Sequence, residues 1–286
     1  MIIYIKKRFF TLAAAVLLLT AVFMYRIEMT EAESTVELPV IMYHNITEKY
    51  NMTGKYAILK TQFENDLKYI KENGYTTVSA KELIDHAQNG TSLPEKPIMI
   101  TFDDGYESFY AYAYPLLREY DMKAIMSVIG AYADLHTQKE DHNLDYSHLT
   151  WYEIDEMAES GYVEIGNHTY DMHKNKGGRK GCNIKYGESE TSYRKALFDD
   201  LLHLQNDLKT HIGKETEIFA YPYGAICKES VPVINDLGFK VVFTCTEKKN
   251  VLSGSSEELL HLGRFNRANG ESSKAFFSRV ERNEGQ

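Results

Sequence analysis

The stretch PIMITFDD, residues 97–104, is an apolar run that ends in two adjacent acids, Asp103 and Asp104. A short, continuous apolar run of this kind predicts a buried β-strand. Comparable strands are expected at residues 38–44, 123–130, 163–168, 217–224, 240–246 and 260–266. The sequence therefore predicts a protein built on buried strands, one of which carries two carboxylates to its end.

Helical segments separate these strands. In residues 61–74 apolar side chains recur at helical spacing, with Thr61 as the expected N-cap and Gly74 as the stop. Thr150 is the expected cap of another helix. Further helices are expected at residues 81–90, 109–120, 151–161, 193–213, 229–238 and 272–281. This alternation predicts an α/β protein with a parallel sheet, and about seven such units favour a (β/α) barrel over an open sheet.

The N-terminus has the pattern of an export signal. A basic flank at residues 6–8 precedes an uncharged apolar run at 9–25. Residues 1–25 are therefore predicted to be a signal anchor or signal peptide, and an uncleaved membrane anchor is favoured because no cleavage site stands out. The polar, acidic residues 26–37 predict a stem, and residues 38–286 the catalytic domain. We expect an extracytoplasmic protein that is anchored to the membrane or secreted.

Charge and cysteine content narrow the classes of partner and site. The net charge of −9 argues against a nucleic-acid partner, which needs a basic face. The three cysteines, Cys182, Cys227 and Cys245, have no C-x-x-C spacing, so neither a zinc ribbon nor a redox motif is supported. One disulfide can form outside the cell, but the sequence leaves its pairing open. The oligomeric state is not readable from the sequence.

Chemically active side chains follow three of the predicted strands. Asp103 and Asp104 end the first, and His44 ends the most N-terminal one. His168 ends a third strand, and His173 lies in the loop beyond it. Their five-residue spacing excludes a shared helix face, but a strand end and a following loop can aim both rings at one point. Functional residues of a (β/α) barrel gather at such strand ends.

This combination of side chains predicts metal-assisted hydrolysis. Two imidazoles and one carboxylate form an open metal site with room for water and substrate. Adjacent side chains of a strand point in opposite directions, so one acid can bind the metal while its neighbour acts as a base. The metal polarises a carbonyl and acidifies water, and the second acid accepts the proton. A third group must protonate the leaving atom, and His44 is suited to this role.

Three motifs resemble one enzyme family. TFDDGY (101–106), NHTYDMH (167–173) and AYPYG (220–224) are similar to the signatures of the NodB-homology polysaccharide deacetylases, carbohydrate esterase family 4. The resemblance covers residues 38–267. It implies a distorted (β/α) barrel and metal-dependent removal of acetyl groups from N-acetylated sugars, in a bacterial protein.

The resemblance also implies a role for each matching residue. Asp103 would be the general base, and Asp104, His168 and His173 would hold the metal. The backbone N–H of Tyr223 would help to form an oxyanion hole.

The chain departs from the common pattern of the family in three ways. Its two histidines are five residues apart rather than four, and the late stretch HLGRFNR lacks the usual acid histidine. Both departures resemble the biofilm-type subgroup, which deacetylates poly-β-1,6-N-acetylglucosamine and takes its acid histidine from an early M-Y-H, here His44. The usual arginine of the third motif is also missing, since Ala220 and Tyr221 occupy that stretch. Arg264 is the candidate that orients Asp103 instead.

The predicted function is removal of N-acetyl groups from an extracellular N-acetylglucosamine polymer, with poly-β-1,6-N-acetylglucosamine favoured and peptidoglycan second. The expected cofactor is a divalent metal ion, zinc first, with cobalt, nickel or iron as alternatives. The basic insertion at residues 174–192 is a solvated loop or a substrate-binding rim. Two other classes stay open, a non-haem iron oxygenase, which also uses two histidines and a carboxylate, and a non-catalytic glycan-binding barrel.

Overall fold

The computed structural model describes Thr20, residues 35–139 and residues 141–282. The predicted anchor apart from Thr20, and residues 26–34 of the predicted stem, lie outside these residues. Within the described parts of the chain, no helix is both long and apolar enough to cross a bilayer. One compact unit begins at Val36, close to the predicted start of the folded domain.

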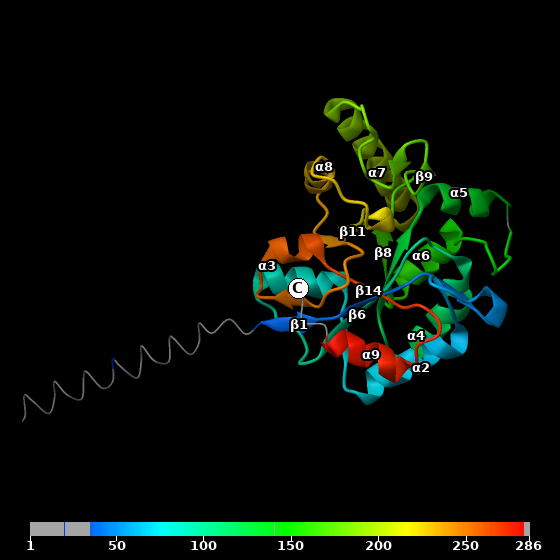
Figure 1. Cartoon of the computed structure of the whole chain (residues 1–286), viewed down its shortest axis with the longest axis vertical. Coiled ribbons are helices and arrows are strands. Elements are labelled where there is room, and N and C mark those ends of the chain that lie inside the picture. Colours follow the sequence, from blue (N-terminus) through cyan, green and yellow to red (C-terminus); the bar gives the residue numbers. More distant parts are fainter. Residues whose placement is uncertain (1–19, 21–34, 140, 283–286) are drawn as a thin grey trace, which may run out of the picture. The chain divides into compact units, whose positions relative to one another are not determined.

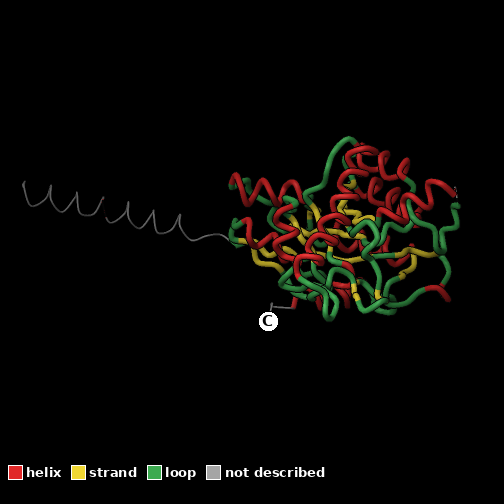
Figure 2. The backbone as a smooth tube through the Cα atoms, turned by 90° about the horizontal axis from the view of Figure 1, so that it is seen from above, coloured by secondary structure: helices red, strands yellow, loops and turns green. Residues whose placement is uncertain are grey.

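A curled sheet of parallel strands forms the centre of this unit, with helices around it (Figures 1 and 2). Its strand order is β12 (Val241–Phe243), β11 (Ile218–Ala220), β8 (Val163–Asn167), β7 (Ala124–Val128), β6 (Pro97–Phe102), β2 (Val40–Tyr43) and β14 (Phe265–Asn266). A short strand, β5 (Thr76–Thr77), pairs with β6 beside this path. The prediction of an α/β protein with a parallel, barrel-like sheet is thus confirmed in the form of a half-barrel.

The segment before β14 links the two ends of this sheet. Leu262 forms a parallel bridge with Phe243 of β12. Phe265 then pairs with Ile41 of β2. The chain thereby crosses the gap that a half-barrel leaves, and it carries Arg264 between the two contacts.

Strand β6 shows how the sheet positions the site. All six of its residues are buried. Ile98, Ile100 and Phe102 pack in a cluster with the outer helices, whereas Met99 belongs to a separate cluster on the other face of the sheet. Because side chains alternate along a strand, Asp103 continues on the face of Met99.

Eight α-helices are described. They are α2 (Lys60–Glu72), α3 (Ala80–Asn89), α4 (Tyr114–Tyr120), α5 (Gly130–Lys139), α6 (Trp151–Glu159), α7 (Glu190–Ile212), α8 (Ser230–Asp236) and α9 (Ser273–Arg282). Helix α2 packs against α4 and α9, and α7 packs against α8 (Figure 1). A π-helix (Phe109–Ala113) precedes α4, and short 3-10 helices lie at Tyr50–Met52, Pro222–Gly224 and Ser256–His261. Helix α5 is not among the helices expected from the sequence, because its apolar residues do not form a continuous stripe.

The two predicted helix caps have different outcomes. Thr150 caps α6 as predicted, since its side chain accepts the Glu153 N–H in a reciprocal capping box. The prediction for Thr61 is wrong, because α2 begins at Lys60 and Leu59 occupies the N-cap position. Strand β4 (Ala57–Leu59) runs directly into this helix, so Thr61 falls inside the first turn.

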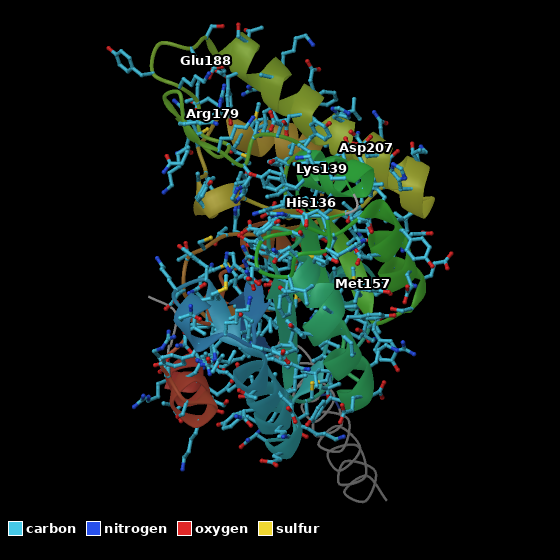
Figure 3. The ribbon with its side chains drawn as sticks, turned by 90° about the vertical axis from the view of Figure 1, so that its right-hand side faces the viewer. His136, Lys139, Met157, Arg179, Glu188 and Asp207 are labelled. Atoms are coloured by element: carbon cyan, nitrogen blue, oxygen red, sulfur yellow. The ribbon has the colours of Figure 1, made fainter. Side chains whose placement is uncertain are left out.

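Three small two-stranded sheets flank the half-barrel. β1 (Val36–Leu38) pairs with β13 (Asn250–Leu252), β3 (Asn45–Thr47) with β4, and β9 (Asn175–Lys176) with β10 (Arg179–Lys180). The β9–β10 hairpin is the first part of the predicted basic insertion. Arg179 and Glu188 close this insertion with a 2.6 Å ion pair (Figure 3). None of the three cysteines forms a disulfide.

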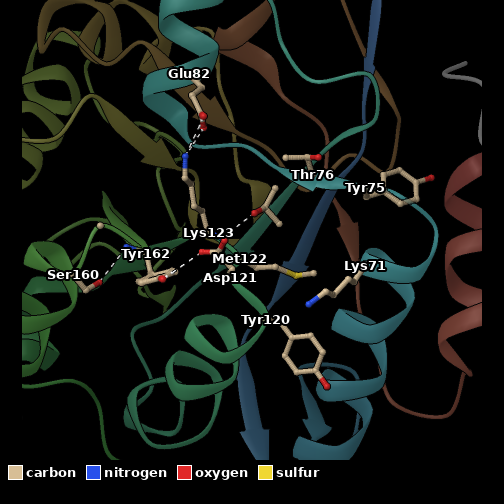
Figure 4. A pocket seen from close by; sticks show the side chains of 12 residues that line it. Lys71, Tyr75, Thr76, Glu82, Tyr120, Asp121, Met122, Lys123, Ser160 and Tyr162 are labelled. Carbon is tan, nitrogen blue, oxygen red and sulfur yellow. Dashed lines mark hydrogen bonds and ion pairs between the residues drawn. The ribbon is translucent and has the colours of Figure 1, made fainter.

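A pocket of about 570 Å³ lies at the N-terminal ends of β5, β7 and β8 (Figure 4). Lys71, Tyr120, Lys123 and Tyr162 are among its lining residues. None of the residues predicted to be functional lines it. Those residues, except Arg264, which precedes β14, follow the carboxyl ends of the strands.

Candidate active site

The predicted functional residues meet at the carboxyl ends of the strands. A cavity of about 430 Å³ is lined by His44, Asp103, Asp104, His168, His173 and Tyr223, together with Met42, Lys55, Tyr56, Tyr106, Lys180, Cys245, Glu247 and Asn266. The register explains this convergence, because Tyr43 pairs with Phe102 and Val128 pairs with Asn167. Every predicted site residue except Arg264 therefore borders one cavity.

Asp104, His168 and His173 have the geometry of a metal site. Their ligand atoms lie within 4.8 Å of one another. The Asp104 Oδ1 atom is 3.5 Å from the Nε2 of His168 and 3.2 Å from the Nε2 of His173. This Oδ1 atom is buried and has no hydrogen-bond partner. An unpaired carboxylate oxygen between two imidazole nitrogens fits a divalent cation.

The surroundings fix how the two imidazoles present their Nε2 atoms. His168 Nδ1 lies 2.8 Å from the Ala220 carbonyl, so Nδ1 carries the proton and donates it. His173 Nδ1 lies 3.3 Å from the hydroxyl of Tyr223. The His168 Nε2 is thereby left unprotonated for a metal, and the Tyr223 hydroxyl contacts the other ring nitrogen of His173, an arrangement by which outer partners orient metal ligands.

The five-residue spacing of the histidines is accommodated by a turn. Thr169 has a left-handed backbone with φ +74°, and its N–H donates to the Asn167 side chain at 2.9 Å. The carboxylate of Asp200 in α7 accepts the N–H groups of Tyr170 and Asp171, both at 2.9 Å. The loop that carries His173 is therefore held in place by helix α7. An acid on a long helix gives no signal of this role in the sequence.

The two adjacent acids diverge for a reason that the sequence does not reveal. Strand alternation was the expected cause, but β6 ends at Phe102. Asp104 and Gly105 both have φ +74°, so the chain turns sharply right after Asp103. A left-handed non-glycine residue is uncommon and concentrates at functional sites. This turn sends Asp104 to the histidines and leaves Asp103 behind it.

Arg264 holds Asp103 in a two-point contact. Its two terminal nitrogens donate to the two carboxylate oxygens, each at 2.7 Å, and its Nε–H donates to the Thr244 carbonyl at 3.0 Å. The side chains of both partners are buried. Burial alone would raise the pKa of Asp103, but the Arg264 guanidinium and His168 outweigh it and hold this pKa below its ordinary value. Asp103 is therefore ionised and oriented, as a base requires.

His44 lines the same cavity as the two acids. Its Nδ1 is buried without a hydrogen-bond partner, and its ring lies 4.7 Å from that of Tyr56. Burial lowers the pKa of His44, and the Asp103 and Asp104 carboxylates oppose this shift. A lowered pKa makes its protonated form a stronger acid. No sequence motif marks the contribution of Tyr56.

Tyr223 joins the site by its backbone and by its side chain. Its φ of +60° is left-handed, and the next residue, Gly224, has φ +62°. A Cβ on Gly224 would lie 2.7 Å from the Cβ of Cys245, so only glycine fits there. The Tyr223 ring lies 4.5 Å from the His173 ring, centroid to centroid, at a tilt of 33°. The sequence did not indicate this side-chain contact, and the oxyanion role of the N–H stays a prediction.

Comparison of the sequence with known proteins identifies a family and named relatives. Residues 90–242 match the family described as "Polysaccharide deacetylase". The poly-beta-1,6-N-acetyl-D-glucosamine N-deacetylase of Escherichia coli (strain K12) is 26% identical over 222 residues, which cover 71% of this chain and 33% of that protein. The protein of the same name from Staphylococcus aureus (strain MRSA252) is 30% identical over 193 residues, which cover 68% of this chain and 62% of that protein.

A solved structure with a similar fold covers most of this chain. The structure of IcaB from Ammonifex degensii superposes with a TM-score of 0.70 at 25% identity, over 87% of this chain and 97% of that one. The described domain therefore has nearly the whole extent of that solved structure, although the chain spans only part of the two curated relatives. From the family match over more than half of its length, the chain belongs to the polysaccharide deacetylase family.

Proposed function

We propose that this protein is a metal-dependent hydrolase that removes N-acetyl groups from poly-β-1,6-N-acetylglucosamine and releases acetate. The observation that carries the proposal is the division of labour between two adjacent acids. Asp104 faces two imidazole nitrogens, whereas Asp103 is held by Arg264. One carboxylate is therefore placed to bind a metal and the other to accept a proton.

The chain's own residues supply the proton transfers. A divalent ion held by Asp104, His168 and His173 supplies Lewis acidity toward the acetamide carbonyl and toward water. Asp103 accepts the proton of the attacking water, since it is ionised and held in place. His44 donates a proton to the departing amine.

The oxyanion that forms when water adds to the acetamide carbonyl needs a hydrogen-bond donor from the protein. We assign this role to the N–H of Tyr223.

Zinc is the proposed metal. Two imidazole nitrogens and one carboxylate leave a coordination position open, as catalytic zinc sites do. The same donor set also accepts cobalt, nickel or iron, so metal analysis of the purified protein has to decide.

The choice of glycan rests on the relatives and on the early histidine. Both curated relatives described above are named as deacetylases of poly-beta-1,6-N-acetyl-D-glucosamine. His44 of the M-Y-H motif lines the cavity. Tyr56 and Tyr106 also line it, and aromatic walls suit a sugar ring. Lys180 of the insertion borders the same cavity, which favours the rim interpretation of that segment.

We also propose an extracytoplasmic location, with the N-terminal segment as membrane anchor or signal peptide. The support is the basic flank and the apolar run at residues 9–25. Protease accessibility on intact cells, together with the mass of the mature protein, tests both parts of this proposal.

The deciding experiment is acetate release from a panel of glycans, with metal analysis of the same sample. The panel holds poly-β-1,6-N-acetylglucosamine, peptidoglycan, chitin oligomers and acetylated xylan. We expect the highest kcat/KM on the first, and a preference for peptidoglycan would replace the proposed substrate.

The Asp103→Asn variant should retain the metal and lose acetate release. Wild-type activity in this variant would contradict the assignment of the base. Oxygen consumption with Fe(II) and a 2-oxoacid would support the oxygenase instead, and glycan binding without acetate release would support a binding protein.

A further inference from the structure

A second cluster of metal-binding side chains lies beside the catalytic turn. Glu107, His142 and Glu153 each present a ligand atom, and these atoms lie within 4.8 Å of one another. Glu107 follows β6, His142 lies between α5 and α6, and Glu153 lies in the first turn of α6. Three separate parts of the chain therefore converge on one point that the proposed hydrolysis does not use.

Glu107 is the residue that points to a ligand. Its side chain is only 5% exposed, and its Oε1 lies 2.6 Å from His142 Nδ1. Its other oxygen, Oε2, is buried and has no hydrogen-bond partner. A buried carboxylate oxygen without a partner is costly, so such an atom calls for a bound proton, water or cation.

Glu153 adds a second buried carboxylate to the cluster. It is 6% exposed, and its Oε2 accepts the N–H and the hydroxyl of Thr150, each at 2.8 Å. Among the described residues, no lysine or arginine forms an ion pair with Glu107 or Glu153. Burial raises the pKa of Glu107, the bond to His142 opposes this shift, and the Glu153 carboxylate adds to it. Two buried carboxylates facing each other need compensating positive charge.

We propose that Glu107, His142 and Glu153 bind a second divalent transition-metal ion, with Zn²⁺ as the expected occupant. Two carboxylates and one imidazole are a donor set that Zn²⁺ accepts. The set is harder than the two imidazoles and one carboxylate of the catalytic centre, so it also suits Mn²⁺. His142 is largely exposed, which gives an ion a path into the site.

The position of this site suggests what the ion does. Glu107 comes three residues after Asp104, and its N–H donates to the Ser147 carbonyl at 2.9 Å. The Leu149 N–H donates to the Gly105 carbonyl at 2.8 Å. The segment that carries His142 thus already runs along the catalytic turn. The ion fastens this segment and α6 to the turn that aims Asp104.

Metal stoichiometry tests the proposal without relying on activity. The full-length protein is loaded with ZnCl₂ or, separately, MnCl₂, desalted and analysed for metal per chain. We expect about two Zn²⁺ ions in the wild type, and about one after Glu107→Gln or His142→Ala. The His168→Ala/His173→Ala variant should still hold about one, and adding Glu107→Gln to it should remove that ion.

Matched variants distinguish loss of the second metal site from general effects of a substitution on the protein. Glu159→Gln removes an exposed carboxylate from the same helix α6 and should leave the stoichiometry unchanged. Added Zn²⁺ should raise the melting temperature of the His168→Ala/His173→Ala variant, and Glu107→Gln should abolish this rise. The exposed His142→Ala change keeps the test valid if Glu107→Gln impairs folding.

One ion in the wild type, and none after loss of His168 and His173, would overturn the proposal and mean that the cluster shares a proton. Two ions retained in Glu107→Gln would overturn it as well. Neither result bears on acetate release, so failure of the second site and failure of the proposed function are distinguishable.

Discussion

Replacing Arg264 by lysine isolates what the two-point contact with Asp103 contributes. Lysine keeps the positive charge but offers one compact ammonium in place of a planar fork. The guanidinium donates at 2.7 Å to each oxygen of Asp103 and at 3.0 Å to the Thr244 carbonyl. A lysine at this position can keep at most some of these hydrogen bonds.

The structure sets the size of the expected effects. Loss of one charge-assisted hydrogen bond costs about 1.5–3 kcal/mol, and loss of the neutral bond to Thr244 about 1 kcal/mol. Both partners are almost fully buried, so water does not replace these bonds. We therefore expect the free energy of unfolding to fall by about 3 kcal/mol. Misplacement of the base should lower kcat by about 10- to 100-fold.

The pH profile is the most diagnostic readout. The guanidinium opposes the effect of burial on Asp103 and holds the pKa of this carboxyl below its ordinary value. A weaker contact lets that pKa rise, so the base becomes protonated at a higher pH. The acid limb of kcat/KM for acetate release should then move toward neutral pH, with metal content measured at each pH.

Arg267 provides the matched control. It is also fully buried, and its guanidinium contacts both oxygens of Asp66 at 2.8 and 3.0 Å. This pair does not line the cavity. Arg267→Lys should therefore cost comparable stability but leave the acid limb in place. If Arg264→Lys shifts the limb no more than Arg267→Lys does, Arg264 does not act through Asp103.

Three further outcomes are expected. Burial raises the pKa of the Asp200 carboxyl from 3.8 to about 6 in the folded chain. The folded state therefore binds the Asp200 proton more tightly than the unfolded state does. The free energy of unfolding falls as the pH rises through this raised pKa. Urea unfolding at pH 4.5 and 7 should show that this loss of stability is absent from Asp200→Asn. The same variant should bind zinc about 10-fold more weakly, measured by competition with a chelator. Gly224→Ala should reduce acetate release without removing the metal, because its Cβ would meet Cys245 at 2.7 Å. Tyr223→Phe should raise the Kd for zinc several-fold, because His173 Nδ1 loses its 3.3 Å partner, and an unchanged Kd would exclude that contact.

Local patterns were enough to find the seven strands of the curled sheet and the residues that follow them, but not the short strands that flank it. Apolar runs such as residues 97–102 have to be buried, and parallel strands place their carboxyl ends at one edge. His44, Asp103 and His168 could therefore be predicted as neighbours. The family resemblance further supplied a role for each of them. Helix α5 could not be predicted in the same way, because periodicity is the main signal for a helix and α5 lacks it.

The contacts between distant parts of the chain were decided only by the tertiary structure. The left-handed turn at Asp104 separates two acids that strand alternation alone does not tell apart. Arg264 reaches Asp103 across 161 positions because its segment crosses the gap of the half-barrel. Asp200 holds the histidine loop from helix α7. The sequence by itself determined which side chains are present and which strands carry them. The contacts of Asp103 with Arg264 and of Asp104 with the two imidazoles depend on distances set by packing, which no local pattern gives.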